Sequence, residues 1–421
     1  MKKYFKSIYK NIIGAFKLEF ALVFASNMAL FLFQFFTNLV LIRILKKDEF
    51  GSFSYVFNIL GLFLLSSGVG IVPGILQYCG LNRNLNERKE YFKFGLRIGL
   101  IFNLFISLII FIIGKLGLLS LSVANELLLV SAFLPFISLI YQATVTYFRA
   151  SLSNKKYSLL LFSYGLTIFV CTYLGAVIKG VLGIIISRYV TFVLLSILGI
   201  SMMGSLKEDE KINIDKRKFV NYSFFSMINN AIYQLFLVID LFLIGQIMVD
   251  PIRVANFKTA SLIPFSLLVI PGTLMNFLYP FFVKNQSDSH WVKKNYYQVL
   301  IISILYNLIL CLIVIIFTNR IVTILFGAKY IEISSLIKIL MIGYFIFAAL
   351  KIPNESILSS TGHVKFNLYN SILGIIIAII ANILFVKIYG IIGAGYSFVA
   401  TTAISCLISY IYINGVVLCK K

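Results

Sequence analysis

Twelve long apolar stretches, separated by short polar segments, make up most of the chain. They cover residues 20–42, 53–78, 94–114, 127–147, 157–178, 181–204, 219–248, 254–283, 296–317, 334–358, 366–386 and 391–415. Each is long enough, at about 1.5 Å per residue, to cross a hydrocarbon core about 30 Å thick as a helix. Because the apolar runs are continuous and do not alternate every second residue, they predict helices and not the strands of a β-barrel.

The composition places these helices in a membrane. Hydrophobic residues make up 60% of the 421 residues, and Asp, Glu, Lys and Arg together make up only 12%. Soluble globular domains carry about 25% charged residues. We therefore predict an all-α integral membrane protein with twelve transmembrane helices.

The net charge of +22 follows the loops between the apolar stretches. If both termini are cytoplasmic, the terminal segments and the cytoplasmic loops hold 23 basic residues, whereas the alternate loops hold ten. Because cytoplasmic loops of membrane proteins are enriched in Lys and Arg, this asymmetry predicts an even number of spans with both ends in the cytoplasm. The charge therefore does not require a nucleic acid as a partner.

The longest polar segment between spans, SLKEDEKINIDKRK, covers residues 205–218 and follows six apolar stretches. It predicts an N-terminal lobe of residues 1–204 and a C-terminal lobe of residues 219–421, joined by a cytoplasmic linker. A weak internal repeat favours two related halves, since FGSFSYVFNI at 50–59 resembles VANFKTASLI at 254–263.

The eighth apolar stretch contains Pro264, Pro271 and Pro280. Each proline removes a backbone donor and clashes with the preceding turn, so the sequence predicts kinks in this span. Inside a membrane such bends are tolerated where protein or a water-filled cavity satisfies the freed carbonyls. Two interpretations stay open at this point, static packing kinks and a moving hinge.

Several common chemistries are missing from the sequence. There is no G-x-x-x-x-G-K-[ST] phosphate loop, so this chain alone is not an ATP-driven pump. The five cysteines are not spaced as metal ligands or disulfide partners, and no Ser/His/Asp set or pair of carboxylates stands out. We therefore expect no catalytic residues, no metal site and no cofactor.

An acid interrupts the seventh apolar stretch, because Asp240 lies within NNAIYQLFLVIDLFLIGQIM at residues 229–248. Residues of a helix turn by about 100° each, which puts Asn229, Tyr233 and Asp240 on one stripe. A charge in hydrocarbon costs roughly 3 kcal/mol, so the acid is expected to meet a cation, take up a proton or line water. The alternative is an interhelical hydrogen bond without a further role.

Amides form a similar stripe in the first span, where Asn27, Gln34 and Asn38 lie on one face of the helix. They either bridge packed helices or line a polar passage. Cations lie inside two further spans, Arg97 in the third and Arg188 in the sixth. Because a guanidinium holds phosphate oxygens in a bidentate fork, these two arginines are candidates for a cationic cavity.

The remaining intramembrane cations have simpler explanations. Arg43, Lys258 and Lys338 lie near the ends of spans, where long basic side chains extend to the interface. Lys351 precedes Glu355 by four residues, a spacing that predicts a local ion pair on one helix.

Several segments resemble polysaccharide flippases of the Wzx type, in the multidrug/oligosaccharidyl-lipid/polysaccharide exporter superfamily. These segments are LIRILKKDEFGSFSYVFNILGLFLLSSGVGI (41–71), DLFLIGQ (240–246), ILFGAKYIEISSLIKIL (324–340) and YGIIGAGYSFVATTAIS (389–405). The resemblance covers essentially the whole chain, but its motifs are diffuse and mostly apolar. It therefore indicates the fold more strongly than the substrate.

The resemblance implies two six-helix lobes that form a V around a central cavity. It also implies transport of an undecaprenyl-diphosphate-linked oligosaccharide, the repeat unit of O-antigen lipopolysaccharide or capsule, from the cytoplasmic to the periplasmic leaflet of the bacterial inner membrane. The substrate would then contact cations and amides of the spans, namely Arg97, Arg188, Arg43, Lys258, Asn27, Gln34, Asn38 and Gln142. Asp240, with Asn229 and Tyr233, would couple transport to H⁺ or Na⁺. Besides membrane lipid, the implied partners are a polysaccharide polymerase and a chain-length regulator.

Other functions within and outside this superfamily stay open. A multidrug cation antiporter is the main alternative, although it would favour a cavity richer in acids than in arginines. A lipid II flippase usually has further spans beyond twelve. A membrane polysaccharide-synthesis enzyme would need a large extramembrane loop, and the longest polar loop here has about fourteen residues.

Overall fold

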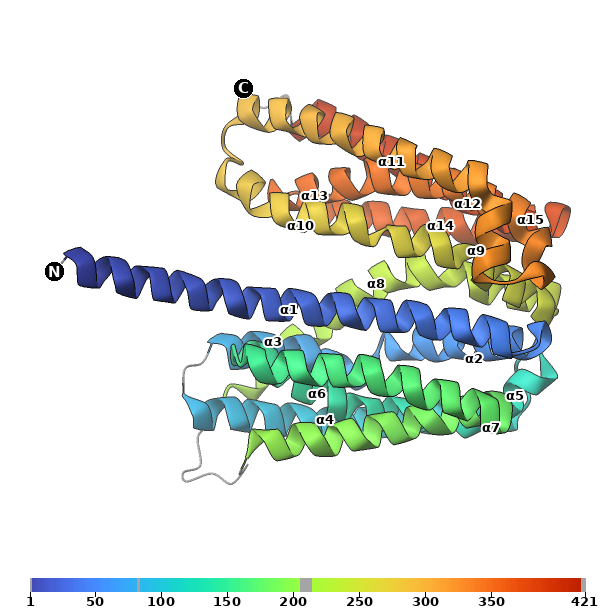
Figure 1. Cartoon of the computed structure of the whole chain (residues 1–421), viewed down its shortest axis with the longest axis horizontal. Helices are drawn as coiled ribbons and strands as arrows, with labels where there is room; N and C mark the ends of the chain where they lie inside the picture. The colour runs from blue at the N-terminus through green and yellow to red at the C-terminus, as the bar shows by residue number, and fades with distance from the viewer. Residues whose placement is uncertain (1, 82–83, 205–213, 418–421) are drawn as a thin grey trace. The chain divides into compact units, whose positions relative to one another are not determined.

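The computed structural model describes residues 2–81, 84–204 and 214–417, which form helices joined by short turns (Figure 1). Side chains are described from residue 21 onward, with six exceptions inside helices: Asn229, Tyr233, Phe236, Leu237, Asn276 and Pro280. Most of the predicted linker at 205–218 lies outside the described residues. The predicted all-α fold is confirmed for the described part of the chain.

Packing divides the chain into two compact units. The first unit contains residues 1–45, 63–118 and 122–230, and the second contains residues 46–62, 119–121 and 231–421. The first unit holds α1 (Lys2–Ile44), α3 (Ile71–Leu81), α4 (Leu85–Lys115), α5 (Ser122–Ser131), α6 (Leu134–Ala150), α7 (Asn154–Met203) and the start of α8 (Lys216–Met248). The second unit holds most of α2 (Lys47–Leu64), the rest of α8, α9 (Pro251–Leu267), α10 (Val269–Lys284), α11 (Ser289–Leu325), α12 (Ser334–Ile346), α13 (Ile352–Ser360), α14 (Val364–Tyr389) and α15 (Ile391–Tyr412).

Each predicted apolar stretch lies in one of these helices or in a broken helix pair. Among the described residues, nine helices are long and apolar enough to cross a membrane, or ten if the bent pair α5 and α6 forms one span. The 50-residue α7 contains two of the predicted stretches, because its backbone leaves the helical conformation at Lys179 and Gly180. The chain is therefore a multi-pass membrane protein.

A break in the second span is held by a side chain from the third. Between α2 and α3, Gly68 and Val69 have φ angles of 59° and 53°, a region that a branched residue rarely adopts. The Gly68 amide donates to Asn103 Oδ1 at 2.6 Å, and Asn103 Nδ2 donates to the Pro135 carbonyl at 2.8 Å. Because no water satisfies such groups in hydrocarbon, this buried asparagine makes the non-helical turn tolerable.

Two further breaks lie in the second unit. The helix is interrupted at Leu268, between α9 and α10 and between Pro264 and Pro271, in the span where kinks were predicted. A π-helical turn at Phe347–Lys351 separates α12 from α13. Such turns widen the helix by one residue and often mark functional sites.

The first part of α2 packs within the second unit. Gly51 lies against Pro251 at the start of α9 so closely that a Cβ would overlap the Pro251 carbonyl. One turn later, the Tyr55 hydroxyl accepts a 2.7 Å hydrogen bond from Gln246 Nε2 of α8. The two segments of the predicted repeat thus both begin helices that meet near their N-termini.

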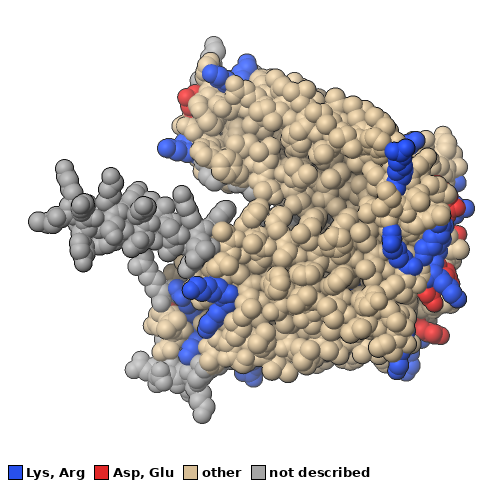
Figure 2. Space-filling view, viewed as in Figure 1, with Lys and Arg blue, Asp and Glu red and all other residues tan. Residues whose placement is uncertain are grey.

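Charged side chains lie mainly towards the ends of the helices. Figure 2 shows Lys, Arg, Asp and Glu at the two ends of the visible face, with a broad surface of other residues between them. This distribution is typical of a protein whose middle is surrounded by hydrocarbon. Charged residues inside this band therefore need a specific explanation.

Candidate functional site

Asp240 of α8 is buried in the second unit, with 7% of its surface exposed. Asn382 of α14 donates from Nδ2 to Asp240 Oδ1 at 2.6 Å, and the same amide nitrogen lies 2.9 Å from the Ala378 carbonyl. Within the described residues, Asp240 forms no ion pair with a basic side chain. The acid that the sequence singled out is therefore held by an amide and not by a cation.

Further polar oxygen atoms lie on α14 and α15. The Ser397 hydroxyl of α15 lies 3.5 Å from the Ala378 carbonyl that also accepts from Asn382. Asn382 Oδ1 and the Thr401 hydroxyl, one turn beyond Ser397, are buried and have no hydrogen-bond partner within the described residues. A carboxylate, an amide oxygen and hydroxyls are the ligands that hard cations prefer, and a buried carboxylate can alternatively take up a proton. The described residues contain no cluster of three His, Cys, Asp or Glu side chains that could hold a metal ion.

The helices that present these groups form one of two matching hairpins. The N-terminal hairpin consists of the two arms of α7, residues 154–178 and 181–203, and the C-terminal hairpin consists of α14 and α15. Gly180 turns the first with φ 56° and ψ −135°, and Gly390 turns the second with φ 61° and ψ −141°. Only glycine adopts this backbone conformation readily.

The same sequence motif follows both turns. It reads G-x-x-G-x-x-x-S-x-x-x-T, from Gly180 to Thr191 and, 210 residues later, from Gly390 to Thr401. A Cβ at the second glycine of either motif would overlap a carbonyl of the opposite arm, so the arms touch through their backbones. This repeat was not predicted, although the motif is visible in the sequence.

Arg188 immediately follows the serine of the N-terminal motif, on the second arm of α7. It is partly buried and interacts electrostatically with Tyr164 of the first arm. Tyr164 stacks on Tyr141 of α6 and on Phe192 of α7, with ring centroids 5.0 and 5.7 Å apart. The predicted intramembrane arginine is thus a cation beside an aromatic cluster in the first unit.

The other predicted substrate residues are spread over several helices. Arg97 on α4 and Arg43 at the end of α1 are exposed, whereas Lys258 on α9 and Gln142 on α6 are partly buried. Two side-chain amides of the α1 stripe donate hydrogen bonds to backbone carbonyls of α1 itself. Asn27 Nδ2 donates to the Val23 carbonyl at 2.7 Å and Asn38 Nδ2 donates to the Gln34 carbonyl at 2.9 Å. The side chains of Asn229 and Tyr233, predicted beside Asp240, lie outside the described residues.

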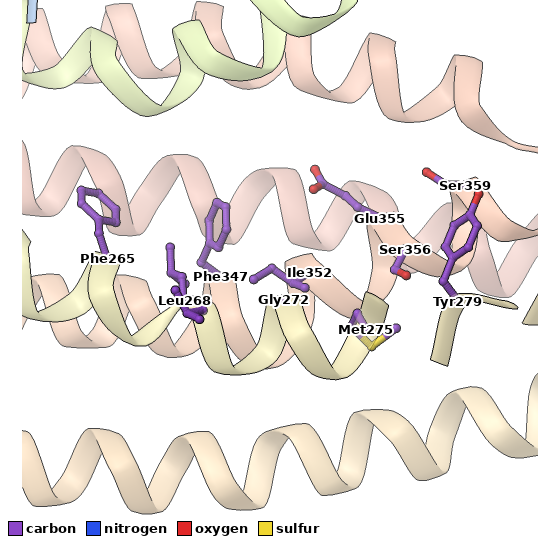
Figure 3. Close-up of a pocket in the computed structure, with 11 residues that line it drawn as sticks. Phe265, Leu268, Gly272, Met275, Tyr279, Phe347, Ile352, Glu355, Ser356 and Ser359 are labelled. Atoms are coloured by element: carbon purple, nitrogen blue, oxygen red, sulfur yellow. The ribbon is translucent and has the colours of Figure 1, made fainter. Parts of the chain in front are cut away.

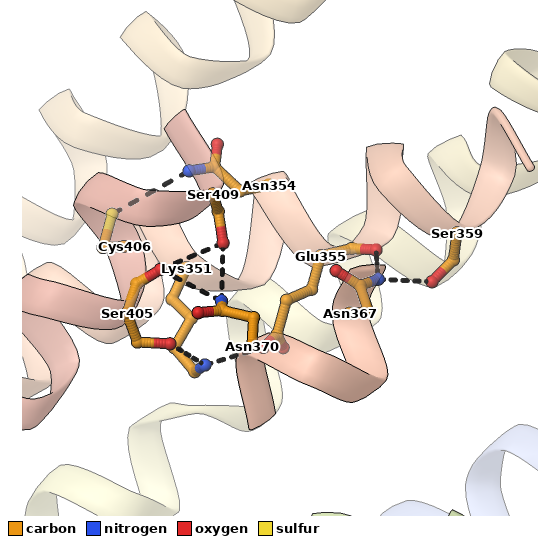
Figure 4. A network of polar contacts seen from close by, with 9 residues as sticks. All are labelled: Lys351, Asn354, Glu355, Ser359, Asn367, Asn370, Ser405, Cys406 and Ser409. Atoms are coloured by element: carbon orange, nitrogen blue, oxygen red, sulfur yellow. Dashed lines mark hydrogen bonds and ion pairs between the residues drawn. The ribbon is translucent and has the colours of Figure 1, made fainter. Parts of the chain in front are cut away.

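A second polar centre surrounds Lys351, which ends the π-helical turn and is 3% exposed. Its Nζ lies 2.7 Å from Glu355 Oε1 and donates to the Ser405 hydroxyl of α15 at 2.8 Å (Figure 4). The ion pair predicted from the four-residue spacing is confirmed. Its burial was not expected, because the partner on α15 is 54 residues away in sequence.

Asparagines extend this centre in both directions (Figure 4). Asn370 Nδ2 donates to the Ser405 carbonyl at 3.0 Å and to the Ser409 hydroxyl at 2.8 Å. Asn367 Nδ2 donates to the Glu355 carbonyl at 2.7 Å and to the Ser359 hydroxyl at 2.8 Å. The network therefore ties α13, α14 and α15 together around one buried cation.

Glu355 also lines a pocket of about 710 Å³ in the second unit (Figure 3). The pocket walls come from both helix breaks and are mainly apolar and aromatic, with a few polar groups: Phe265, Leu268, Val269, Gly272, Met275, Tyr279, Phe347, Ile352, Glu355, Ser356 and Ser359. The carboxylate thus connects the pocket wall to the buried lysine. Predominantly apolar walls with a few placed polar groups are typical of small-molecule sites.

Known structures share this fold at low sequence identity. Lipid II flippase MurJ in an inward closed conformation has a TM-score of 0.74 and is 12% identical, and the match covers 94% of this chain and 87% of that chain. A multidrug resistance MATE family transporter of the MOP superfamily, in an inward-facing conformation, has a TM-score of 0.73 and is 15% identical, with 92% of this chain and 94% of that chain covered. A transporter of the same MOP superfamily from Pyrococcus furiosus Vc1, described as having a binding pocket of reverse polarity, has a TM-score of 0.61 and is 13% identical, with 96% and 95% covered.

Sequence comparison narrows the relationship further. No curated protein sequence matches the chain. A family model described as polysaccharide biosynthesis protein matches residues 40–335, which is more than half of the chain. The fold is that of MOP-superfamily transporters, and the chain belongs to the polysaccharide biosynthesis protein family.

Proposed function

We propose that the protein is a flippase that moves a lipid-linked oligosaccharide across the bacterial inner membrane by ion-coupled alternating access. The family match supports a role in polysaccharide biosynthesis, and the fold supports a transporter. The proposed substrate is an undecaprenyl-diphosphate-linked repeat unit of O-antigen or capsule. Both termini would lie in the cytoplasm, as the loop charges predict.

The observation that most directly supports ion coupling is the burial of Asp240 with no cationic partner among the described residues. A carboxylate without a cationic partner in a membrane helix is costly unless it binds a proton or an ion. Binding H⁺ or Na⁺ there would change the charge of α8 and bias one state of the transporter over another. Asn229 and Tyr233 stay the proposed neighbours of this site.

Substrate binding is assigned to the cations and amides predicted from the sequence. Arg188 is the leading group, because a guanidinium recognises diphosphate oxygens and the adjacent aromatic rings of Tyr141 and Tyr164 suit sugar or lipid. The remaining proposed contacts are Arg97, Arg43, Lys258, Asn27, Gln34, Asn38 and Gln142.

The test is a deletion strain complemented with the wild type, Asp240→Asn or Arg188→Ala. We expect lipid-linked oligosaccharide to accumulate in the deletion strain, as measured by mass spectrometry of extracted lipids. The wild type should clear it and neither variant should. Normal surface polysaccharide with both variants at wild-type membrane levels would refute the site assignments, and an unchanged deletion strain without a second flippase would refute the function.

A multidrug cation antiporter is the second candidate, since the Glu355 pocket combines one acid with aromatic walls. Such a pocket would suit an apolar cation if the Glu355 carboxylate were released from Lys351. We expect a susceptibility panel of cationic drugs to be unchanged by the deletion. Increased sensitivity, with normal lipid-linked sugars, would favour the antiporter.

A further inference from the structure

A second pocket lies at one end of the first unit, where the ends of four helices meet the side of α1. Its volume is about 450 Å³, and residues of α1, α3, α4, α6 and α7 line it: Val23, Leu76, Gly80, Arg88, Arg149, Ala150, Leu152, Asn154 and Tyr157. Lys and Arg side chains gather towards this end of the unit in Figure 2. The loops that contribute to it were predicted to be cytoplasmic from their charge. The proposed transport function uses none of these side chains.

Two guanidinium groups line this pocket. Arg88 lies in the first turns of α4, and Arg149 lies in the last turn of α6. Arg149 is exposed, and no carboxylate of the described residues pairs with it. An anion in this cavity would be attracted by both guanidinium groups. Guanidinium groups bind phosphate oxygens in particular, because their donors match the spacing of two oxygens.

The start of α7 borders the same pocket through Asn154. Asn154 is the first residue of α7, and the preceding Ser153 makes no side-chain capping bond to the helix. The first turn of a helix presents amide N–H groups and the positive end of its dipole, which together attract phosphate.

The rest of the pocket is apolar and points to a lipid rather than to a free anion. Val23 and Leu76 line it from membrane-spanning helices, and Leu152 lies in the turn between α6 and α7. Leu152 is 78% exposed and has a φ of 55°, a backbone conformation unfavourable for a leucine. An exposed leucine at the membrane surface gains contact with acyl chains. A soluble phosphate ion would leave these side chains without a partner.

We propose that this pocket binds the phosphate headgroup of an anionic phospholipid of the surrounding membrane. Arg88, Arg149 and the start of α7 contact the phosphate. The acyl chain lies along Val23, Leu76 and Leu152. The bound lipid joins the ends of four helices to the side of α1, so we expect it to stabilise the first unit in addition to anchoring it at the interface.

The experiment uses the full chain, purified in detergent, stripped of lipid and titrated with dioleoyl phosphatidylglycerol. Native mass spectrometry measures the fraction with bound lipid. In Arg88→Gln/Arg149→Gln, we expect the apparent affinity to fall at least fivefold, about 1 kcal/mol. The matched control Lys89→Gln/Lys155→Gln removes the same charge at the same end from residues that do not line the pocket, and it should bind like the wild type. Phosphatidylcholine should bind weakly to all forms.

Further variants separate lipid binding from folding. If the double variant does not fold, phosphatidylglycerol binding is measured with Arg149→Gln alone. This variant changes only an exposed side chain, so we expect it to fold, and its affinity should also fall. Leu152→Gly relieves the backbone conformation, so it should keep or raise thermal stability while weakening phosphatidylglycerol binding. If the arginine and lysine double variants lost equal affinity for phosphatidylglycerol, or if neither lost any, the proposed lipid site would be refuted. If millimolar inorganic pyrophosphate displaced bound phosphatidylglycerol as effectively as added lipid does, the ligand of this pocket would be a soluble phosphate and not a lipid.

Discussion

The two hairpins share a backbone and differ in the polar side chains that they present. At positions 210 residues apart, Thr172 corresponds to Asn382, and Arg188 corresponds to Phe398. In the C-terminal hairpin, Asn382 reaches Asp240 of α8, which lies outside the hairpin. In the N-terminal hairpin, the Thr172 hydroxyl has no hydrogen-bond partner within the described residues, and the charge belongs to the hairpin itself at Arg188. The two hairpins thus have the same closely packed backbone, but the hairpin of the first unit carries a cation, whereas the hairpin of the second unit contacts an acid on α8.

The difference extends to the second polar centre. Ser405 of the C-terminal hairpin, which accepts from Lys351, corresponds to the buried Leu195 of the N-terminal hairpin. The N-terminal hairpin therefore has an apolar side chain where the C-terminal hairpin meets a buried ion pair. The comparison indicates that packing positions were kept in both halves, whereas positions facing neighbouring helices diverged.

The largest expected effect concerns that ion pair. Glu355→Gln leaves the Lys351 ammonium without its carboxylate, and breaking a buried pair on one side costs about 3–5 kcal/mol. We expect a large drop in the thermal unfolding midpoint of the purified protein in detergent. The double variant Lys351→Met/Glu355→Gln should recover most of the loss. A stable single variant would mean that the lysine does not need its acid.

The glycine contact should be equally sensitive in both hairpins. Alanine at Gly183 or at Gly393 forces the arms apart, because the added Cβ overlaps a backbone carbonyl. Overpacking of this kind costs about 2 to 3 kcal/mol. Gly61→Ala is the matched control, since a Cβ there meets nothing within 4 Å. If the thermal unfolding midpoints of Gly183→Ala and Gly393→Ala fell by different amounts, the two hairpins would not be equivalent.

The asparagine and the threonine should behave differently. Asn382→Leu keeps the branching at Cγ but removes the 2.6 Å hydrogen bond to Asp240, and it should cost about 2 kcal/mol. Thr172→Val should be neutral or stabilising, because the buried hydroxyl has no partner within the described residues. Both are measured by thermal unfolding at pH 7. Equal effects would show that the acid contact contributes nothing to stability.

The smallest effect distinguishes the two motif serines. The Ser187 hydroxyl donates to the Cys171 carbonyl of the opposite arm at 2.6 Å, whereas the Ser397 hydroxyl lies 3.5 Å from its acceptor. Ser187→Ala should therefore cost about 1 kcal/mol, and Ser397→Ala should cost less. A reversed order in the unfolding midpoints would contradict the geometry.

Apolar run length predicted the helices well, because crossing hydrocarbon requires long apolar segments. The turn between the stretches ending at 178 and beginning at 181 was predicted, and it lies at Lys179 and Gly180. The break held by Asn103 was not predicted, since the groups that satisfy it come from two other helices. Apolar patterning does not record such long-range contacts.

The sequence predicted one part of each polar centre but not the residues that surround it. Asp240 stood out as an acid in an apolar stretch, but its partner Asn382 is 142 residues away and lies on another helix. Lys351 and Glu355 were paired correctly by spacing, yet spacing does not report that the lysine is buried. One residue supplies the chemistry in each case, whereas its environment is set by tertiary packing.

The asparagine-supported break of the second span also constrains biosynthesis. The Gly68 amide depends on Asn103, and Asn103 in turn depends on the Pro135 carbonyl. These groups leave the ribosome one after another, so the second segment cannot reach its final form in the bilayer until the fourth has been inserted. Nascent chains truncated before residue 135 should therefore remain accessible to proteases or insertion factors around Gly68.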